Sequence, residues 1–407
     1  MTVPDLSGAL DLADPDFRQN PYPHYERLRD ESGLFWHEGY LAYVVPRYED
    51  VARVLKSSRW HVRPGSGFLD RQLAANETVN QLMQGFYYFL DDPHHRRLRS
   101  VVSTTFTPRI VSSFRGRIQQ IVDGLLDSSL GERGEAEFMN DVSYPLTIRV
   151  VTEILGFDAE EDQKFLYDRA LALAGLLEWD APVERVTEGG ESMMEISNRF
   201  VDLLESRRQE PRDDLISSLI AARAEGRTSD DFEVIFMCVL LVTVGYETTM
   251  NYLGNSVYSL LTHPDQFERL VRDPGMLGSG PALDELLRYE APVQVTSRVA
   301  MDDVDVAGTR IRAGEQVVVM LGGSNRDPGV FTDPDRLDLG RANANRHMTF
   351  AHGPHFCLGA ALAKTEAEIL LSTLARRYPG VRLAPDHRWR DTAILRSLSH
   401  LPLRLEK

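Results

Sequence analysis

One long apolar segment in the middle of the chain limits the folds that this sequence can adopt. Residues 229–261 predict a single helix, roughly 50 Å long at about 1.5 Å per residue, capped by Ser229 or Asp230 and ended before Pro264. Its middle, residues 234–245, is apolar on every side, so we expect this helix to cross the core of a folded domain. The apolar stretch itself is too short to span a bilayer.

The rest of the chain predicts a large, mainly helical protein. With 407 residues, of which 43% are hydrophobic and 26% charged, it can bury a large core. Further helices are predicted at 22–30, 48–57, 92–106, 108–128, 141–155, 160–179, 182–208 and 360–377, and short strands at 41–45, 293–306, 317–320 and 393–405. No linker or internal repeat divides the chain, so we expect one domain over residues 1–407, mainly α with small peripheral sheets.

Charge and cysteine content exclude several classes of protein. The net charge of −16 argues against nucleic acid as a partner, because it repels a phosphate backbone. Two cysteines cannot build a disulfide framework and are typical of a reducing compartment, so we expect a cytoplasmic protein. Residues 1–17 carry several aspartates and no apolar run, which predicts neither a signal peptide nor a membrane anchor.

The densest chemistry lies in residues 350–359, a Gly/Pro-rich loop that contains Cys357 and leads into the helix predicted at 360–377. At a helix N-terminus the dipole and the unpaired N–H groups favour thiolate over thiol. Three interpretations compete. Cys357 could be a small buried residue in a turn; it could bind zinc together with histidines; or it could be the axial thiolate ligand of haem iron. The candidate zinc ligands are His347, His352, His355 and Cys357.

The loop resembles the haem-binding signature of the cytochrome P450 monooxygenases, Phe-x-x-Gly-x-His-x-Cys-x-Gly. The matching residues are Phe350, Gly353, His355, Cys357 and Gly359. This resemblance implies a single P450-like domain, with haem b as cofactor and Cys357 as the proximal iron ligand, whose electron donation favours O–O cleavage. At Ala351 the family usually has Gly or Ser, and a small residue there is expected to have little consequence.

Residues 244–249 interrupt the apolar helix with a glycine, an acid and two hydroxyl groups. Threonines that bond back to the helix and a paired glutamate would explain this run structurally. Alternatively, the glycine opens room, and an acid followed by an alcohol relays protons into a dry cavity. The run resembles the oxygen-activation motif of the family, which implies that Gly245 makes space for dioxygen and that Glu247 and Thr248 deliver protons. Val244, where Ala or Gly is usual, would crowd the haem and influence which substrate carbon reaches the iron.

Two further patterns gain meaning only from this resemblance. Glu285 and Arg288 match the Glu-x-x-Arg helix of the family, and the segment 333–338 resembles the one that supplies a third member, which predicts a buried triad of Glu285, Arg288 and Arg336. By itself such a pair is weak evidence, because Glu-x-x-Arg occurs elsewhere in this chain.

The haem propionates need cationic and hydrogen-bonding partners. His95 and Arg99 share one face of a predicted helix, which alone would suggest a solvated basic face. The resemblance assigns both to a propionate clamp, together with Arg298 and His355. His94 is the alternative to His95.

The chain has no Gly-x-Gly-x-x-Gly fingerprint after a strand and no cysteine cluster, so electrons are expected from a separate ferredoxin or flavodoxin with its reductase. A docking patch for this partner is predicted from basic residues near the proximal motifs: Arg96, Arg97, Arg109, Arg341, Arg346 and Lys364. Ordinary surface charge explains the same residues equally well.

Apolar residues of the distal segments are the candidates for a lipophilic substrate pocket, although any of them could be plain core. They are Phe68, Phe86, Tyr87, Phe89, Leu176, Leu177, Trp179, Val293, Val295, Ile394 and Leu395. The sequence thus predicts a monomeric monooxygenase that inserts one oxygen atom from O2 into a lipophilic small molecule, in natural-product tailoring. The alternatives are a haem-thiolate enzyme that couples phenols, decarboxylates or uses peroxide, and a haem-binding sensor or carrier.

Overall fold

The computed structural model describes residues 10–31, 33–62, 76–104, 107–157, 160–176, 178 and 181–406. Contacts within the chain group it into two compact units. The first comprises Met1–Arg59, Val111–Leu146 and Thr248–Lys407, and the second comprises Trp60–Ile110 and Thr147–Glu247. The single domain over residues 1–407 therefore stays a prediction.

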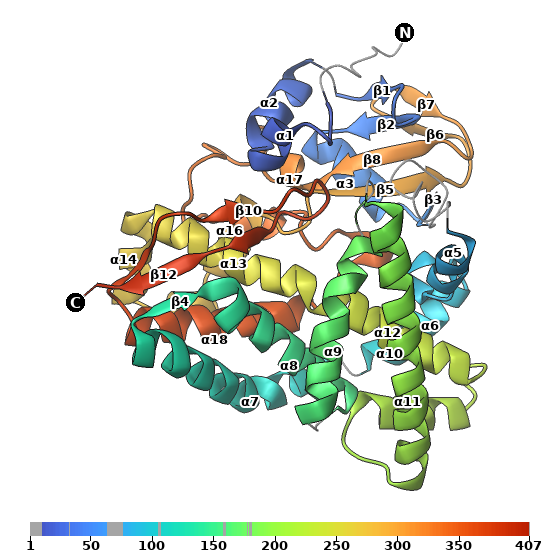
Figure 1. The fold of residues 1–407 in the computed structure, drawn as a ribbon. Helices are drawn as coiled ribbons and strands as arrows, with labels where there is room; N and C mark the ends of the chain where they lie inside the picture. The colour runs from blue at the N-terminus through green and yellow to red at the C-terminus, as the bar shows by residue number, and fades with distance from the viewer. Residues whose placement is uncertain are drawn as a thin grey trace. The chain divides into compact units, whose positions relative to one another are not determined.

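A small mixed sheet forms one part of the first unit (Figure 1). Four of its strands are neighbours in the order β1 (Phe35–His37), β2 (Ala42–Val45), β8 (Gln316–Met320) and β5 (Val295–Ala300). β2 and β8 are parallel, whereas β1 and β5 run antiparallel to their neighbours. Every residue of β8 is buried, as expected for a run of β-branched side chains covered on both faces. The helices α2 (Tyr22–Glu31) and α3 (Tyr48–Lys56) pack on the short helix α17 (Leu321–Ser324) that follows β8.

The other part of the first unit is built around α18 (Ala360–Arg377), whose side chains are mostly buried. It contacts α14 (Pro264–Arg272), α15 (Met276–Ser279) and α16 (Ala282–Tyr289). The helix α7 (Pro108–Leu126) is tied to α18 by a hydrogen bond from Gln119 Nε2 to Thr373 Oγ1 (3.0 Å) and by an ion pair between Arg115 and Glu368. The helix predicted at 360–377 is confirmed, with the same first and last residues.

Small sheets complete this unit. Strand β12 (Pro402–Leu405) pairs with β4 (Glu135–Glu137) and with β9 (Val381–Leu383). Two further sheets have two antiparallel strands each. They are formed by β6 (Val304–Val306) with β7 (Thr309–Ile311) and by β10 (Arg388–Trp389) with β11 (Leu398–His400). The prediction of small sheets in a mainly helical protein is confirmed.

The second unit is helical, with α10 (Val183–Gln209) at its centre. Its helices are α5 (Glu77–Gln84), α6 (His94–Ser103), α9 (Glu160–Leu173), α10, α11 (Leu215–Ala224), α12 (Asp231–Gly245) and most of α8 (Tyr144–Leu155). α10 packs against α9, α11 and α12. A buried ion pair between Arg207 and Asp214 (2.5 Å) joins the end of α10 to the start of α11, and the same guanidinium donates to the carbonyl oxygen of Gly156.

The long helix predicted over residues 229–261 is interrupted, which corrects the prediction of a single element. α12 begins after Asp230, whose side chain accepts from the Glu233 N–H, and it ends at Gly245. A new helix, α13 (Glu247–Thr262), follows. Two features accompany the break: glycine stabilises a helix poorly, and the Tyr246 hydroxyl donates to the carbonyl oxygen of Ala170, 76 residues earlier in the chain (2.5 Å). By length and composition residues 231–262 could cross a bilayer, but 67% of its apolar window is buried, as in a core helix.

Candidate functional site

The cysteine loop closes on itself immediately before α18. The Cys357 N–H donates to the Phe350 carbonyl oxygen (2.9 Å), and the Phe356 N–H donates to the Gly353 carbonyl oxygen (3.1 Å). Gly359 is the N-cap residue of α18. Cys357 is therefore held at the N-terminal end of an 18-residue helix, where the helix dipole and the N–H groups favour a thiolate.

Two residues of the loop have backbone angles in the left-handed region. Gly353 has φ +72°, and a Cβ atom there would lie 2.5 Å from the Leu55 carbonyl oxygen of α3, so this position accepts only glycine. Ala351 has φ +55°, a conformation that costs an L-residue about 1 kcal/mol or more. The expectation that alanine there has little consequence stays a prediction.

The two cysteines of the chain differ sharply in their surroundings. Cys238 lies inside α12, fully buried, and burial raises the pKa of its thiol. Cys357 is only half-buried, and the neighbouring Phe356 ring is 43% exposed, which leaves an apolar surface beside the sulfur. Such an arrangement fits a thiol that meets a bulky flat group better than it fits a small core cysteine.

The zinc interpretation is not supported by the donor atoms. The His347 ring is engaged on both sides, because Nε2 contacts Asp284 Oδ1 (3.1 Å) and Nδ1 accepts from the Thr349 N–H (3.2 Å). Across the described part of the chain no three or more His, Cys, Asp or Glu side chains are grouped so as to hold a metal ion. A single thiolate donor remains, which would fit a haem iron that takes one ligand from the protein and the rest from a porphyrin.

Arg298 provides an independent indication of an anionic group. Its side chain, on β5, is only 3% exposed, and its guanidinium donates to Thr296 Oγ1 (3.1 Å) and to the Ser297 carbonyl oxygen (2.6 Å). Within the described ranges it pairs with no carboxylate. A buried guanidinium that lacks an acidic partner is costly unless an anion approaches it, and a haem propionate is such an anion. Arg298, His355 and Cys357 all belong to the first unit.

The predicted clamp residues on α6 belong to the second unit. His95 is buried, whereas His94 is exposed, so the helical register favours His95. Burial and the Arg99 charge lower the pKa of His95, which keeps its ring neutral at pH 7, with one N–H to donate. Arg99 follows one turn later and is half-buried. Their part in a propionate clamp with Arg298 and His355 stays a prediction.

The predicted distal residues lie at the break between α12 and α13. Glu247, the first residue of α13, is buried, and Thr248 is half-buried. A Cβ at Gly245 would meet Val151 Cγ2 at 3.4 Å, and the Val244 side chain is 39% exposed. Thr243, which precedes the run 244–249, donates from Oγ1 to the Val239 carbonyl oxygen (2.9 Å). The same kind of bond for Thr248 and Thr249 stays a prediction.

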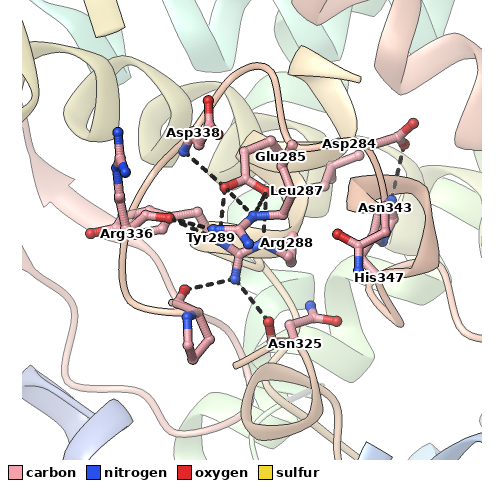
Figure 2. A network of polar contacts seen from close by, with 12 residues as sticks. Asp284, Glu285, Leu287, Arg288, Tyr289, Asn325, Arg336, Asp338, Asn343 and His347 are labelled. Carbon is pink, nitrogen blue, oxygen red and sulfur yellow. Dashed lines mark hydrogen bonds and ion pairs between the residues drawn. The ribbon is translucent and has the colours of Figure 1, made fainter. Parts of the chain in front are cut away.

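The buried ionic triad exists, but its third member is not Arg336. The Glu285 carboxylate accepts two hydrogen bonds from Arg288, at 2.7 and 2.8 Å (Figure 2). It accepts two more from Arg341 Nε, at 3.0 and 3.1 Å. Arg336 supplies only its carbonyl oxygen, which accepts from Arg341 (2.9 Å), and its side chain points away into solvent. The backbone turns tightly at Asp333, with φ +47°, and the carbonyl oxygen of Asp333 accepts from Arg341. The chain after this turn brings the Arg341 side chain back to Glu285.

This result also corrects the predicted docking patch. Arg341 is buried and cannot meet a partner. Arg97 makes a two-pronged ion pair with Glu233, Arg96 pairs with Asp92 (2.5 Å), and Lys364 pairs with Asp284. Arg346, Arg109 and Arg96 remain exposed, since the ion pair with Asp92 leaves the Arg96 side chain 81% exposed.

The candidate pocket residues are largely core. Phe86, Tyr87, Leu176, Val295 and Leu395 are buried. Phe68, Leu177 and Trp179 lie outside the described residues. Sequence reasoning missed Asp284 and His347 as partners; the only available signal was their position beside the Glu-x-x-Arg motif and the cysteine loop.

Comparisons with known proteins identify the class that this fold and this loop define. A family model described as Cytochrome P450 matches residues 281–390. The chain is 37% identical to a biotin biosynthesis cytochrome P450 of Bacillus subtilis, over 98% of this chain and 100% of the relative. It is 35% identical to the 6-deoxyerythronolide B hydroxylase of Saccharopolyspora erythraea, over 100% of this chain and 99% of the relative.

Solved structures agree. A crystal structure of P450BioI in complex with an acyl carrier protein that carries hexadec-9Z-enoic acid has a TM-score of 0.89 and 35% identity, and covers 96% of this chain and 100% of that one. The crystal structure of CalO2 also has a TM-score of 0.89, at 31% identity, with 98% of each chain covered. The chain belongs to the cytochrome P450 family. It is a bacterial-type haem-thiolate monooxygenase that takes electrons from a redox partner.

Proposed function

We propose that this cytochrome P450 hydroxylates or epoxidises a lipophilic small molecule in the cytoplasm, as a step of natural-product tailoring, with Cys357 as the iron ligand. The half-buried thiol of Cys357, before the start of α18, carries this proposal, and the backbone N–H of Cys357 donates to the Phe350 carbonyl oxygen. When bound, the haem supplies the oxidising chemistry that activates O2.

The chain's own residues have separate roles in the proposal. Arg298 and His355, with His95 and Arg99, hold the propionates, since guanidinium and imidazole groups supply N–H donors to carboxylates. Glu247 and Thr248 move protons at the break between α12 and α13, where an acid is followed directly by an alcohol. Val244 narrows the space beside Gly245 and biases which carbon of the substrate is oxidised.

The ligand assignment is tested by the visible spectrum of the reduced protein with carbon monoxide. Cys357→Ser should abolish the red-shifted Soret band of thiolate-ligated haem. Cys238→Ser is the matched control, because this second cysteine is buried inside α12, and it should leave the band in place. Retention of the band in Cys357→Ser would refute the assignment.

The reaction class is tested by the mass of the product formed under labelled dioxygen. Incorporation of one labelled oxygen atom supports insertion, whereas phenol coupling and decarboxylation leave the product without it. Fatty acyl chains, free and attached to a carrier protein, form the first substrate panel, because a similar structure holds such a chain. Thr248→Ala distinguishes an enzyme from a carrier. In an enzyme this variant should consume reductant without forming the matching amount of product. A sensor or carrier would form no product, either as the parent protein or as the variant.

We propose an acidic ferredoxin or flavodoxin as the electron donor. Arg346 is the exposed basic residue of the first unit that remains from the predicted patch, with its nearest acid, Glu49, at 4.0 Å. Arg346→Glu should slow reduction by the donor more at low salt than at high salt, since salt screens such attraction. If Arg346→Glu slows reduction by the same factor at both salt concentrations, Arg346 does not take part in docking.

A further inference from the structure

Asp284 stands beside the triad residue Glu285 on α16 but serves a different set of partners. Glu285 accepts from two arginines, whereas the Asp284 carboxylate points to the other side and meets His347 (Figure 2). Asp284 Oδ1 also receives the Lys364 ammonium from α18. Although burial alone raises the pKa of Asp284, hydrogen bonds from His347 and Lys364 outweigh burial and leave this pKa below its ordinary value. The carboxylate is therefore ionised and shared by two donors.

His347 is fixed by its two ring nitrogens. Because Nδ1 accepts from the Thr349 N–H, the ring proton resides on Nε2 and is donated to Asp284. Burial lowers the pKa of His347, which keeps this neutral tautomer. The segment that follows is held further by Asn325, whose side chain accepts from the Met348 N–H (2.6 Å) and donates to Thr349 Oγ1 (2.9 Å).

Both partners of Asp284 contact the ring of Phe350. The His347 ring lies edge-on to it, with centroids 5.6 Å apart, and the Lys364 ammonium lies 5.9 Å from its centroid. The carbonyl oxygen of the same Phe350 accepts the Cys357 N–H at 2.9 Å. A chain of contacts thus runs from one carboxylate through two side chains to the residue that holds the cysteine backbone.

Charge follows the same route. Lys364 lies in the second turn of α18, close after Cys357, and its side chain is 35% exposed. Asp284 compensates this cation, so the pair adds little net field at the sulfur. Without the carboxylate the cation would be unbalanced in a partly buried region, where charges interact more strongly than in water.

We propose that Asp284 is a positioning residue for the Cys357 thiolate: through His347 and Lys364 it fixes Phe350, and it balances the Lys364 charge near the sulfur. This inference rests on the proposed ligation of the haem by Cys357.

The test uses the haem-loaded full chain and measures its reduction potential. Asp284→Asn leaves the Lys364 cation unbalanced, which favours the added electron, so the potential should rise. Lys364→Met leaves the carboxylate unbalanced, so the potential should fall. The double variant should return close to the parent value. Glu268→Gln is the control, because it removes a carboxylate from an exposed ion pair with Arg272 in the same unit.

Hydrogen exchange gives a second readout that does not depend on the potential. Asp284→Asn should make the amides of residues 347–357, including that of Cys357, exchange about fivefold faster, as expected for one weakened hydrogen bond. Glu268→Gln should leave these amides unchanged.

The proposal would be overturned if Asp284→Asn and Lys364→Met have the same reduction potential as the Glu268→Gln control. It would also be overturned if both variants shift the potential in the same direction. If Asp284→Asn does not load haem, the sign of the shift in Lys364→Met decides. Failure of the ligand assignment itself would be recognised separately, because the parent protein would then lack the thiolate spectrum before any Asp284 variant is made.

Discussion

Ala351 has a backbone conformation that glycine adopts without strain and alanine does not, with φ +55°. We expect Ala351→Gly to raise the free energy of unfolding by about 1 kcal/mol, because it removes the steric conflict of the Cβ atom. Urea unfolding of the haem-loaded protein measures this change. Ala361→Gly, at an exposed position of α18, is the matched control and should lower stability by about 1 kcal/mol. Equal destabilisation by both variants would contradict the strain.

Glu366 is a buried acid that takes no part in the candidate site or in the triad. It lies on α18, only 1% exposed, and its Oε2 atom has no hydrogen-bonding partner among the residues that the structure describes. Burial raises the pKa of this carboxyl well above its ordinary value, so the folded protein keeps it protonated. In the unfolded chain the same group ionises above about pH 4.5.

A pH dependence of stability follows from this acid. Since the unfolded state releases the proton of Glu366 first, its contribution to stability is present below pH 4.5 and is lost as pH rises towards the folded-state pKa. The loss is at most about 1.4 kcal/mol per pH unit. Glu366→Gln removes this loss, so the variant should gain stability over the parent at pH 8 but not at pH 4.5, by urea unfolding at each pH. A gain independent of pH would contradict the assignment.

At the scale of elements, the triad joins α16 to the segment after the Asp333 turn. Arg341→Met should destabilise the protein by about 3 kcal/mol, because it breaks a buried ion pair and strands the carbonyl oxygens that Arg341 serves. Arg336→Met should change stability by less than about 0.5 kcal/mol, as its side chain is exposed. Chemical denaturation of both variants checks this pair of outcomes, and the reverse order would restore Arg336 to the triad.

Elements with a strong local signal could be predicted from the sequence. α18 has a clean helical pattern after Gly359, and β8 is a run of β-branched residues. The break after Gly245 could not be predicted, because it depends on a hydrogen bond from Tyr246 to Ala170 far away in the chain. The third member of the triad is hard to predict for a similar reason: Arg336 and Arg341 both follow the same turn, and only the path of the backbone decides which guanidinium reaches Glu285.

The residues of the candidate site also differ in how well the sequence predicts their contacts. The loop around Cys357 is local in sequence, so its contacts follow from its glycines and from the helix after it. The role of Asp284 depends on side chains from three separate segments, and no spacing rule predicts that contact.

At the scale of the whole molecule, the chain groups into two compact units, while the sequence predicts a single domain. Three of the four crossings between the units lie inside predicted elements, such as the helix at 108–128, rather than in linkers. We therefore expect cooperative unfolding of the haem-loaded protein, with transitions that coincide when followed by far-ultraviolet circular dichroism, tryptophan fluorescence and the Soret band. Two separate transitions in urea would show that the units fold as independent domains.

The ionic network around Glu285 depends more on the route of the main chain than on the side chains along it. Arg288 donates to the carbonyl oxygen of Pro334, and Arg341 donates to those of Thr332 and Arg336. Main-chain oxygens are present whatever the residue, so in a saturation mutagenesis library positions 332 and 336 should tolerate most replacements. Natural substitutions at positions 332 and 336 should therefore leave the network around Glu285 intact, even in relatives whose residues at these positions differ from those of this chain.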